Sequence, residues 1–425
     1  MIVQEKPGEV KPGIARKHHY NCGFGGGNLG TSIAGAETTG GAETIRRLLA
    51  SGLRGRGGGW FPAARKWQAV RVEGGEPLVV GNGAEGEPGS VKDRWVMLNR
   101  PRDVIRGLVI AARAVGAREA VVYLKGSFAA PAAALERATG EEPLGGVGVK
   151  VVRGDDSYIA GEETAVIEVL EGRRAWPRPK PPLPAAVGFH GRPTLVQNVE
   201  TLSRVPDAIA DPEGFRAGER TLVSLWGHVR RPGVYEVALG TTLRRVVEEH
   251  GGGTPDGIGM VFPAGPSAPP LTRAQLDTPL HPDALREAGS ALGTAAVLVV
   301  GASACPLSVG ASLAAFFERE ACGQCPPCTV GTSRLAGALR AVEAGAARPT
   351  DLDALAETAG FMSVHGYCAH CRTAAAAVPG LLARFRDDVA AHLEARACPR
   401  GGAAADPFAS GSPERRAIES TIGSP

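Results

Sequence analysis

Short apolar runs alternate with helical patterns between residues 44 and 215. A helix is predicted from Asp103, because apolar residues then recur every three or four positions until Gly116, a residue type that commonly ends helices. Strands are predicted at residues 78–80, 120–124 and 149–152. Strands that alternate with helices are typical of a parallel sheet, so we expect residues 44–215 to form an α/β domain.

The pattern changes after residue 220. Residues 221–226 and 234–237 are predicted strands joined by a Pro-Gly turn, and a helix is predicted near residues 243–250. We therefore expect residues 221–300 to form a compact mixed β/α module.

One long uncharged run extends from residue 288 to residue 317. It is interrupted by Gly301 and Pro306, so it predicts a strand followed by the start of a helix and not a membrane span. Alanine-rich helical patterns lie between cysteines after this run, which predicts a helical domain over residues 305–398. The remaining segments, residues 1–43 and 399–425, are expected to be a flexible arm and a disordered tail.

Composition narrows the possible functions. A net charge of +3 spread over 425 residues gives no case for a nucleic-acid partner, because binding to phosphate backbones needs clustered cations. The first residues mix charges and prolines and lack the apolar stretch of a secretory signal. We expect a cytoplasmic protein without direct membrane insertion.

The cysteines are concentrated in one region of the chain. Cys322, Cys325 and Cys328 lie in one short loop, each separated from the next by two residues. In a reducing compartment such clustering favours metal binding over disulfides, and three thiolates at this spacing are typical of iron–sulfur loops, which take a fourth cysteine from elsewhere. Cys368 and Cys371 are both candidates for that fourth ligand.

A zinc ribbon is the alternative interpretation. The two C-x-x-C pairs at 322–325 and 368–371 would supply its ligands and leave Cys328 outside the site. The third cysteine of the loop favours the iron–sulfur interpretation. Cys22, Cys305 and Cys398 have no paired spacing, and we interpret them as structural or incidental; we interpret His365 and His370 as polar neighbours of the cysteines and not as ligands.

Three further segments carry candidate binding residues. The glycine-rich stretch from Arg54 to Pro62 could expose backbone N–H groups to a phosphate, or it could be only a tight turn. The loop from Asn82 to Gly89 leaves a predicted strand, which is where α/β sheets bind ligands. Glu162 and Glu163 open a predicted helix, where carboxylates are also commonly mere partners of the helix dipole.

Taken together, these segments resemble the flavin-binding subunit of bacterial respiratory NADH dehydrogenase and its relatives in NAD-dependent hydrogenases and formate dehydrogenases. The resemblance covers about residues 44–395. The matching segments, in the family's order, are Ser51 to Gly58, Glu85 to Gly89 with Lys92 to Arg94, Tyr158 to Thr164, Lys180 to Pro182, Asn198 to Thr201, and Cys322 to Cys328. The resemblance implies an α/β fold with a Rossmann-like flavin domain, then a ubiquitin-like β-grasp module, then an α-helical bundle that carries one 4Fe–4S cluster.

The resemblance also implies a role for individual residues. FMN would lie over the glycine loop at Gly55, Gly57 and Gly58. It would also contact residues of three other segments: Asn82, then Tyr158, Gly161 and Glu162, then Asn198. NADH would meet it near Phe61, Lys66, Glu87, Glu163 and Lys180, with Glu87, Glu163 and Lys66 in catalytic positions. Cys368 stands at the position where the family has its fourth cluster ligand; the other three would be Cys322, Cys325 and Cys328.

Two hypotheses of function follow. The first is an NADH dehydrogenase (diaphorase) subunit that takes hydride from NADH onto FMN and passes single electrons through the cluster to a partner subunit with further iron–sulfur clusters. The second is a diverged relative that retains the cluster as an electron relay or structural element and no longer oxidises NADH. It is motivated by departures from the family pattern: Trp60 in a position normally glycine, Ala84 in place of an acidic residue, Gln197 in place of an asparagine, and Ala69 and Leu183 at two positions that are usually phenylalanine.

Overall fold

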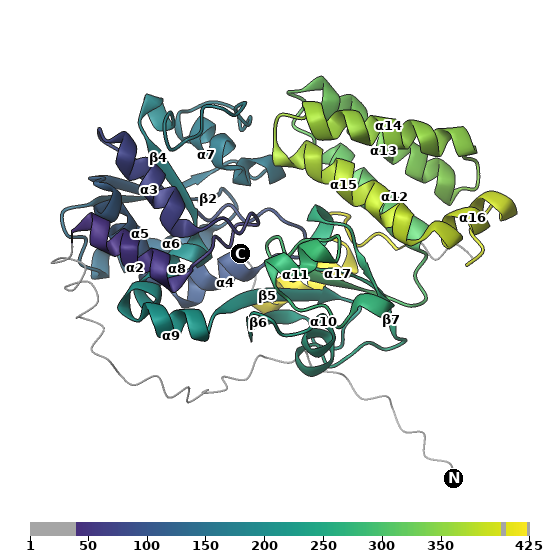
Figure 1. Ribbon diagram of the computed structural model, residues 1–425, viewed down its shortest axis with the longest axis horizontal. Coiled ribbons are helices and arrows are strands. Elements are labelled where there is room, and N and C mark those ends of the chain that lie inside the picture. The colour runs from purple at the N-terminus through teal and green to yellow at the C-terminus, as the bar shows by residue number, and fades with distance from the viewer. Residues whose placement is uncertain (1–39, 401–404, 423–425) are drawn as a thin grey trace, which may run out of the picture.

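The computed structural model describes residues 40–400 and 405–422, so most of the expected N-terminal arm (1–43) lies outside the described residues. Two sheets and a group of helices follow one another along the chain (Figure 1). Helices α12 to α15 lie together on one side of the molecule, and the first sheet with its covering helices lies on the other (Figure 1). No helix in the described part of the chain combines the length and apolar character needed to cross a membrane.

The first sheet has four parallel strands in the order β3-β2-β1-β4. The three strands predicted from the apolar runs are present, and the sequence reasoning missed the fourth, β4. The strands are β1 (Leu78–Asn82), β2 (Glu119–Lys125), β3 (Gly148–Gly154) and β4 (Thr194–Asn198). The chain adds β2 and β3 on one side of β1 and then returns to place β4 on the other. This doubly wound order confirms the predicted parallel α/β layer.

Helices cover the faces of this sheet and build the largest core. The predicted helix at Asp103 is α5 (Pro101–Val115); it begins two residues before Asp103, with Pro101 in its first turn, and ends at Gly116 with φ +85°. It packs closely on α8, because a Cβ on Gly107 would lie 1.9 Å from the carbonyl oxygen of Leu202. The other helical elements are α2 (Gly41–Ser51), α3 (Ala63–Glu73), α4 (Lys92–Asn99), α6 (Ala129–Glu141), η1 (Tyr158–Gly161), α7 (Glu163–Leu170), η2 (Phe189–Gly191), α8 (Val199–Ala210) and α9 (Pro212–Ala217).

The second sheet has five strands in the order β6-β5-β9-β7-β8. Its central pair, β5 and β9, is parallel, and its other pairs are antiparallel. The strands are β5 (Arg220–Gly227), β6 (Gly233–Ala238), β7 (Ile258–Phe262), β8 (Leu271–Thr272) and β9 (Ala296–Gly301); the helical elements are α10 (Leu243–Arg245), η3 (Val246–His250), η4 (Gly265–Ser267), η5 (Arg273–Gln275) and α11 (Pro282–Glu287). The mixed β/α character expected for this part of the chain is confirmed.

Five helices form the region that contains most of the cysteines. They are α12 (Pro306–Arg319), α13 (Pro326–Glu343), α14 (Pro349–His365), α15 (Ala369–Arg384) and α16 (Arg386–Ala395). Their shared core is aliphatic and aromatic, with Phe316, Phe317 and Leu339 almost completely buried. The run at 288–317 is a strand and a helix, as predicted.

The prediction of a disordered tail from residue 399 is wrong for residues 405–422. These residues form α17 (Pro413–Glu419) and η6 (Ser420–Ile422), and α17 packs against β5. Phe408 is fully buried, with its ring 5.4 Å from that of Phe262 and 6.3 Å from that of Trp226. One buried aromatic side chain anchors a segment whose Gly, Ala and Ser content predicted no structure.

Candidate functional site

Several of the predicted site residues gather around the carboxyl ends of β1 and β4, a region that we call the crevice. Asn82 ends β1, Asn198 ends β4, and the two are register partners in adjacent strands. The strand order reverses between these two strands, and ligands of open α/β sheets bind at such a switch point. The Asn82 side chain crosses the crevice, donating to the carbonyl of Gly161 at 2.8 Å and accepting from the N–H of Ala84 at 3.1 Å.

The glycine loop lies against Asn198. A Cβ on Gly57 would be 3.2 Å from the Asn198 Cβ, so the absence of a side chain allows this close approach. The loop is closed by a hydrogen bond from the N–H of Gly55 to the carbonyl of Phe61 (2.9 Å), and the N–H of Arg56 donates to the Thr201 hydroxyl (2.8 Å). The loop is thus a fixed backbone surface at the edge of the crevice, which fits the phosphate-cradle interpretation.

Trp60 points away from this loop and into the second module. Its indole N–H donates to the carbonyl of Gly293 at 2.7 Å, and its ring belongs to the core beneath the second sheet. The buried guanidinium of Arg56 lies 4.2 Å from the ring centroid. The ring therefore fills a junction between the domains, and its bulk gives no steric reason to expect altered flavin binding.

A buried ionic network lies under the crevice and joins its loops. The Lys92 ammonium lies 2.6 Å from Asp93 and 3.0 Å from Glu200. Burial opposes the charge of Lys92, but these two carboxylates raise its pKa. The Asn198 amide donates to Asp93 at 2.8 Å, and its carbonyl oxygen caps α8. The loops after β1 and β4 are therefore tied to one another before any ligand binds.

Lys66, Glu163 and Lys180 form a second ionic group in the crevice. The Lys66 ammonium lies 2.7 Å from one oxygen of Glu163, and the Lys180 ammonium lies 2.6 Å from the other. Burial alone would raise the pKa of Glu163, but the two cations hold it at about 2. All three side chains remain partly exposed, so this charged group faces the crevice.

Glu162 has a capping role. It accepts from the N–H groups of Thr164 and Ala165 at the start of α7 and also from Lys180 at 2.8 Å. The interpretation of Glu162 as a partner of the helix start is therefore confirmed. The same lysine therefore bridges Glu162 and Glu163.

Glu87 is a carboxylate that side chains from two separate parts of the chain contact. It accepts from Tyr158 at 3.0 Å and from Ser267 at 2.5 Å. Burial raises its pKa to about 7 despite these two hydrogen bonds. Ser267 lies in η4 of the second module, in a proline-rich loop with no recognisable motif, and sequence reasoning missed it.

Lys125 is a second residue that sequence reasoning missed. It ends β2, and its ammonium lies 3.5 Å from the position that a Cβ on Gly86 would take. Burial lowers its pKa. The rule that strand ends carry ligands could have identified it.

The side chain of Phe61 stands at the open side of the crevice and is 56% exposed. Leu183, one of the two positions where the resemblance leads us to expect phenylalanine, is also 56% exposed. Ala69, the other, is exposed on α3. None of the three is needed for the core, so substitution at these positions leaves the fold intact.

The predicted cluster cysteines converge at the meeting point of α13 and α15. Cys325 caps the start of α13 and Cys328 lies in its first turn, while Cys368 caps the start of α15. These three are buried and Cys322 is half-buried. Neighbouring thiols and burial raise the pKa of Cys328 strongly, and burial raises that of Cys368 to about 11. A site that crowds thiols in this way fits a cationic iron–sulfur core, which binds them as thiolates.

Cys371 is buried beside Cys328, and its thiol lies 3.5 Å from the carbonyl of Met362. Both candidate fourth ligands are therefore close to the loop. His370 lies 3.0 Å from the Phe317 carbonyl through its ring nitrogen, and His365 is exposed on α14. Neither histidine joins the thiol group.

The segment from Tyr158 to Glu162 connects the crevice to the thiols. On one side it contacts Asn82 and Glu87. On the other, Ile159 and Ala160 pack against Cys368, with Cys322 at the edge of the same apolar cluster. A crevice of this kind, joined to a pocket of thiols, defines a flavin- and iron–sulfur-containing electron-transfer subunit.

Comparison with known proteins identifies the family. Residues 48–207 match the Nuo51 FMN-binding domain, residues 222–260 an SLBB domain, and residues 295–392 the NADH-ubiquinone oxidoreductase-F iron–sulfur binding region. The chain is 38% identical over 379 residues to the second F-type subunit of NADH-quinone oxidoreductase from Rhizobium meliloti, covering 84% of this chain and 90% of that one. It is also 38% identical over 379 residues to the F-type subunit of NADH-quinone oxidoreductase from Streptomyces coelicolor, covering 84% of each. An NAD+-reducing NiFe hydrogenase in its H2-reduced state is similar in structure, with a TM-score of 0.75, 33% identity, and coverage of 88% of this chain and 67% of that one.

The chain belongs to the family of F-type subunits of NADH-quinone oxidoreductase. It contains that family's FMN-binding domain and 4Fe–4S binding region.

Proposed function

We propose that this chain is the electron-input subunit of a larger complex, and that its crevice and thiol pocket work as one path. Its function is that of its family: it oxidises NADH and relays the electrons through FMN and a 4Fe–4S cluster. The observation that carries the residue-level proposal is the position of Tyr158 to Glu162, which contact the crevice on one side and Cys368 on the other. Bound FMN supplies the ability to accept a hydride and release single electrons, and the cluster carries those electrons.

We assign the FMN site to the glycine loop and the ends of β1 and β4. Gly55, Gly57 and Gly58 would present the backbone of the loop to the phosphate. The fixed network around Asn82 and Asn198 supports this assignment, since a preorganised site loses little entropy when a ligand binds. Tyr158, Gly161 and Glu162 would form the side of the flavin site nearest the thiols.

We assign the dinucleotide side to Phe61, Lys66, Glu87, Glu163 and Lys180. The two lysines hold Glu163 ionised, and Lys180 also pairs with Glu162, so this side of the crevice would present both ammonium and carboxylate groups to a dinucleotide. Glu87 has a pKa of about 7, so near neutral pH it can hold or release a proton at its carboxyl oxygen. Tyr158 and Ser267 orient that carboxyl from two different domains.

We assign Cys322, Cys325, Cys328 and Cys368 as the cluster ligands. Cys368 packs with Ile159 and Ala160, with Cys322 at the edge of the same apolar cluster, whereas Cys371 lies in the helical core that also contains Cys325 and Cys328. This difference in surroundings supports Cys368 as the fourth ligand.

We further propose that the second sheet is a β-grasp module and that the domains are residues 44–215, 221–300 and 305–398. The sheet order β6-β5-β9-β7-β8 around a parallel central pair supports the β-grasp assignment. The apolar cores centred on the first sheet, the second sheet and the helical region support these divisions.

A partner with further iron–sulfur clusters would dock where the cluster lies nearest the surface. Beside the cysteine loop, an open groove between α13 and α14 is lined by Pro326, Pro327 and Val330 on one side and by Phe361 on the other. Val330 is 50% exposed and Phe361 55% exposed, so the groove presents neighbouring apolar side chains to the solvent. Lysine at both positions should release a co-purifying iron–sulfur subunit and leave NADH oxidation by ferricyanide unchanged.

The proposed function is tested on the chain purified without oxygen. Flavin, iron and sulfide analysis should give FMN and a 4Fe–4S cluster, and the chain should reduce ferricyanide with NADH. Zinc without sulfide, or flavin without NADH oxidation, would contradict it.

A further inference from the structure

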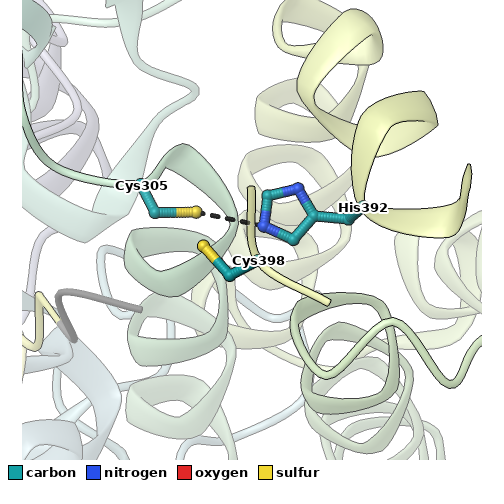
Figure 2. A group of neighbouring side chains, drawn as sticks. All are labelled: Cys305, His392 and Cys398. Carbon is teal, nitrogen blue, oxygen red and sulfur yellow. Dashed lines mark hydrogen bonds between the residues drawn. The ribbon is translucent and has the colours of Figure 1, made fainter. Parts of the chain in front are cut away.

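Two cysteines that lack paired spacing in the sequence meet a histidine far from the cluster. Cys305, His392 and Cys398 present one sulfur or nitrogen atom each, and these atoms all lie within 4.8 Å of one another. Figure 2 shows the two thiols and the imidazole converging on one point from three segments. Cys305 precedes α12, His392 lies in α16, and Cys398 follows α16.

From this geometry we propose that Cys305, His392 and Cys398 bind one zinc ion that joins the end of α16 to the start of α12. Two thiols and one imidazole are ligands that Zn²⁺ prefers, and three protein ligands with a water molecule complete a tetrahedral site. The two thiolates would balance the charge of the ion.

The distance between the ligand atoms fits such an ion. Zinc bonds sulfur at about 2.3 Å and nitrogen at about 2.0 to 2.1 Å, so tetrahedral angles place the two ligand atoms about 3.6 Å apart. The Cys305 sulfur and the His392 Nε2 are 3.3 Å apart. Only a small outward movement of either side chain would admit the ion.

His392 is held in the orientation that a ligand needs. Its Nδ1 lies 2.7 Å from the carbonyl oxygen of Asp388, one turn earlier in the helix. A carbonyl only accepts, so Nδ1 carries the proton and Nε2 keeps its lone pair toward the thiols. Metal-bound histidines are commonly fixed in this way by a second hydrogen bond.

The surroundings hold the three segments together. Cys305 is fully buried and His392 is 1% exposed, while Cys398 is half-buried and gives water access to the fourth position. Arg400 follows the site and pairs with Asp388 at 2.8 Å, and it also donates to the carbonyl of Ala302 at 3.2 Å. The same two segments are thus tied beside the proposed ion as well as through it.

This site is separate from the iron–sulfur site. Cys305 precedes the 14-residue helix α12 and Cys322 follows it, and a helix of that length spans about 20 Å. Three ligand atoms this close together suit a single ion, whereas a 4Fe–4S cluster takes four thiolates around a larger core.

Metal analysis of the full chain, purified without oxygen, tests the proposal. We expect one zinc per chain in addition to the cluster iron. His392→Asn retains a side-chain N–H donor for the Asp388 carbonyl but removes the ligand atom, and it should lose the zinc with the iron unchanged. Cys305→Ser should do the same, and Cys322→Ser should lose iron and keep zinc. His365→Gln, a change of an exposed histidine on α14, is the matched control and should keep both metals.

Two results would overturn the proposal. The first is a failure of the zinc analysis: the wild-type chain contains no zinc, or zinc is lost in Cys322→Ser and retained in His392→Asn. The second is a disulfide between Cys305 and Cys398 in a sample of the chain whose free thiols were alkylated before exposure to air. If the variants do not fold, the wild-type chain decides: exchange with Co²⁺ should produce thiolate-to-cobalt absorption in one equivalent, and its absence counts against the site.

Discussion

The crevice and the thiol pocket are built in opposite ways. The crevice is held by charged and polar side chains that reach across from separate loops, such as Lys66 to Glu163 and Asn82 to Gly161. The thiol pocket is held by apolar packing, with Cys368 among Ile159 and Ala160. We therefore expect a single substitution to weaken the crevice only in part, whereas loss of one proposed cluster thiolate should abolish cluster binding.

The largest expected effect comes from the thiol pocket. Cys368→Ser should reduce bound iron and sulfide to background, because a serine hydroxyl is a poor substitute for a thiolate ligand. Cys371→Ser is its matched control, since this thiol is also buried and interacts with Cys328, and it should retain the full cluster. If the two variants exchanged these results, our assignment of the fourth ligand would be wrong.

At the crevice, we expect Lys66→Met to weaken NADH binding without abolishing it. This change removes one of the two cations that ionise Glu163, and hydrogen bonds to charged groups contribute about 1.5 to 3 kcal/mol. The KM for NADH should rise roughly tenfold to a hundredfold, with bound FMN unchanged. Lys150→Met, at an exposed lysine of β3, is the control in the same steady-state assay. An unchanged KM would place the dinucleotide elsewhere.

Trp60→Gly restores the residue that the family normally has at this position, and it separates the effect of the ring on stability from its effect on flavin binding. Removing the ring from the core of the second module should lower the free energy of unfolding by about 3 to 5 kcal/mol, less whatever glycine regains at a residue whose φ is +50°. Because the ring points away from the crevice, FMN affinity should not change. Denaturation and flavin titration of the same variant separate the two effects, and tighter FMN binding would mean that the ring does crowd the flavin.

The smallest expected effect is the pH dependence of Glu87. Its pKa in the folded chain is about 7, above the ordinary value of 4.5, so the folded state holds its proton more tightly than the unfolded state does. Stability should therefore fall as pH rises from about 4.5 through 7, and this contribution is present in full only below that range. Glu87→Gln removes the dependence, so it should be more stable than the wild type above pH 7 by about 1 to 3 kcal/mol and similar to it near pH 5. A constant difference between the two chains across this range would contradict the shifted pKa.

Local sequence patterns predicted the parts of the molecule whose causes are local. Apolar runs predicted β1, β2 and β3, and Gly116 marked the end of α5 because a left-handed residue is required there. The three cysteines of the loop predicted the thiol pocket, because their spacing alone brings them together.

Contacts between distant segments could not be read in the same way. Ser267 reaches Glu87 only because the second module lies against the first domain. The place of the Trp60 ring in the second module could not be read from the local sequence, because its partner, Gly293, is more than two hundred residues away in the chain. Phe408 orders the tail through rings on β5 and β7, and Cys305 meets Cys398 only after the helices between them have packed.

The central claim is that the crevice and the thiol pocket form one electron path. It is tested most directly by adding NADH, without oxygen, to the purified chain while flavin absorbance and the electron paramagnetic resonance of the cluster are followed together. We predict that NADH bleaches the flavin and that reducing equivalents then reach the cluster in the wild-type chain, while Cys368→Ser shows bleaching alone. A wild-type chain that holds its full complement of FMN and iron, and in which NADH bleaches the flavin while the cluster signal never changes, would contradict the claim.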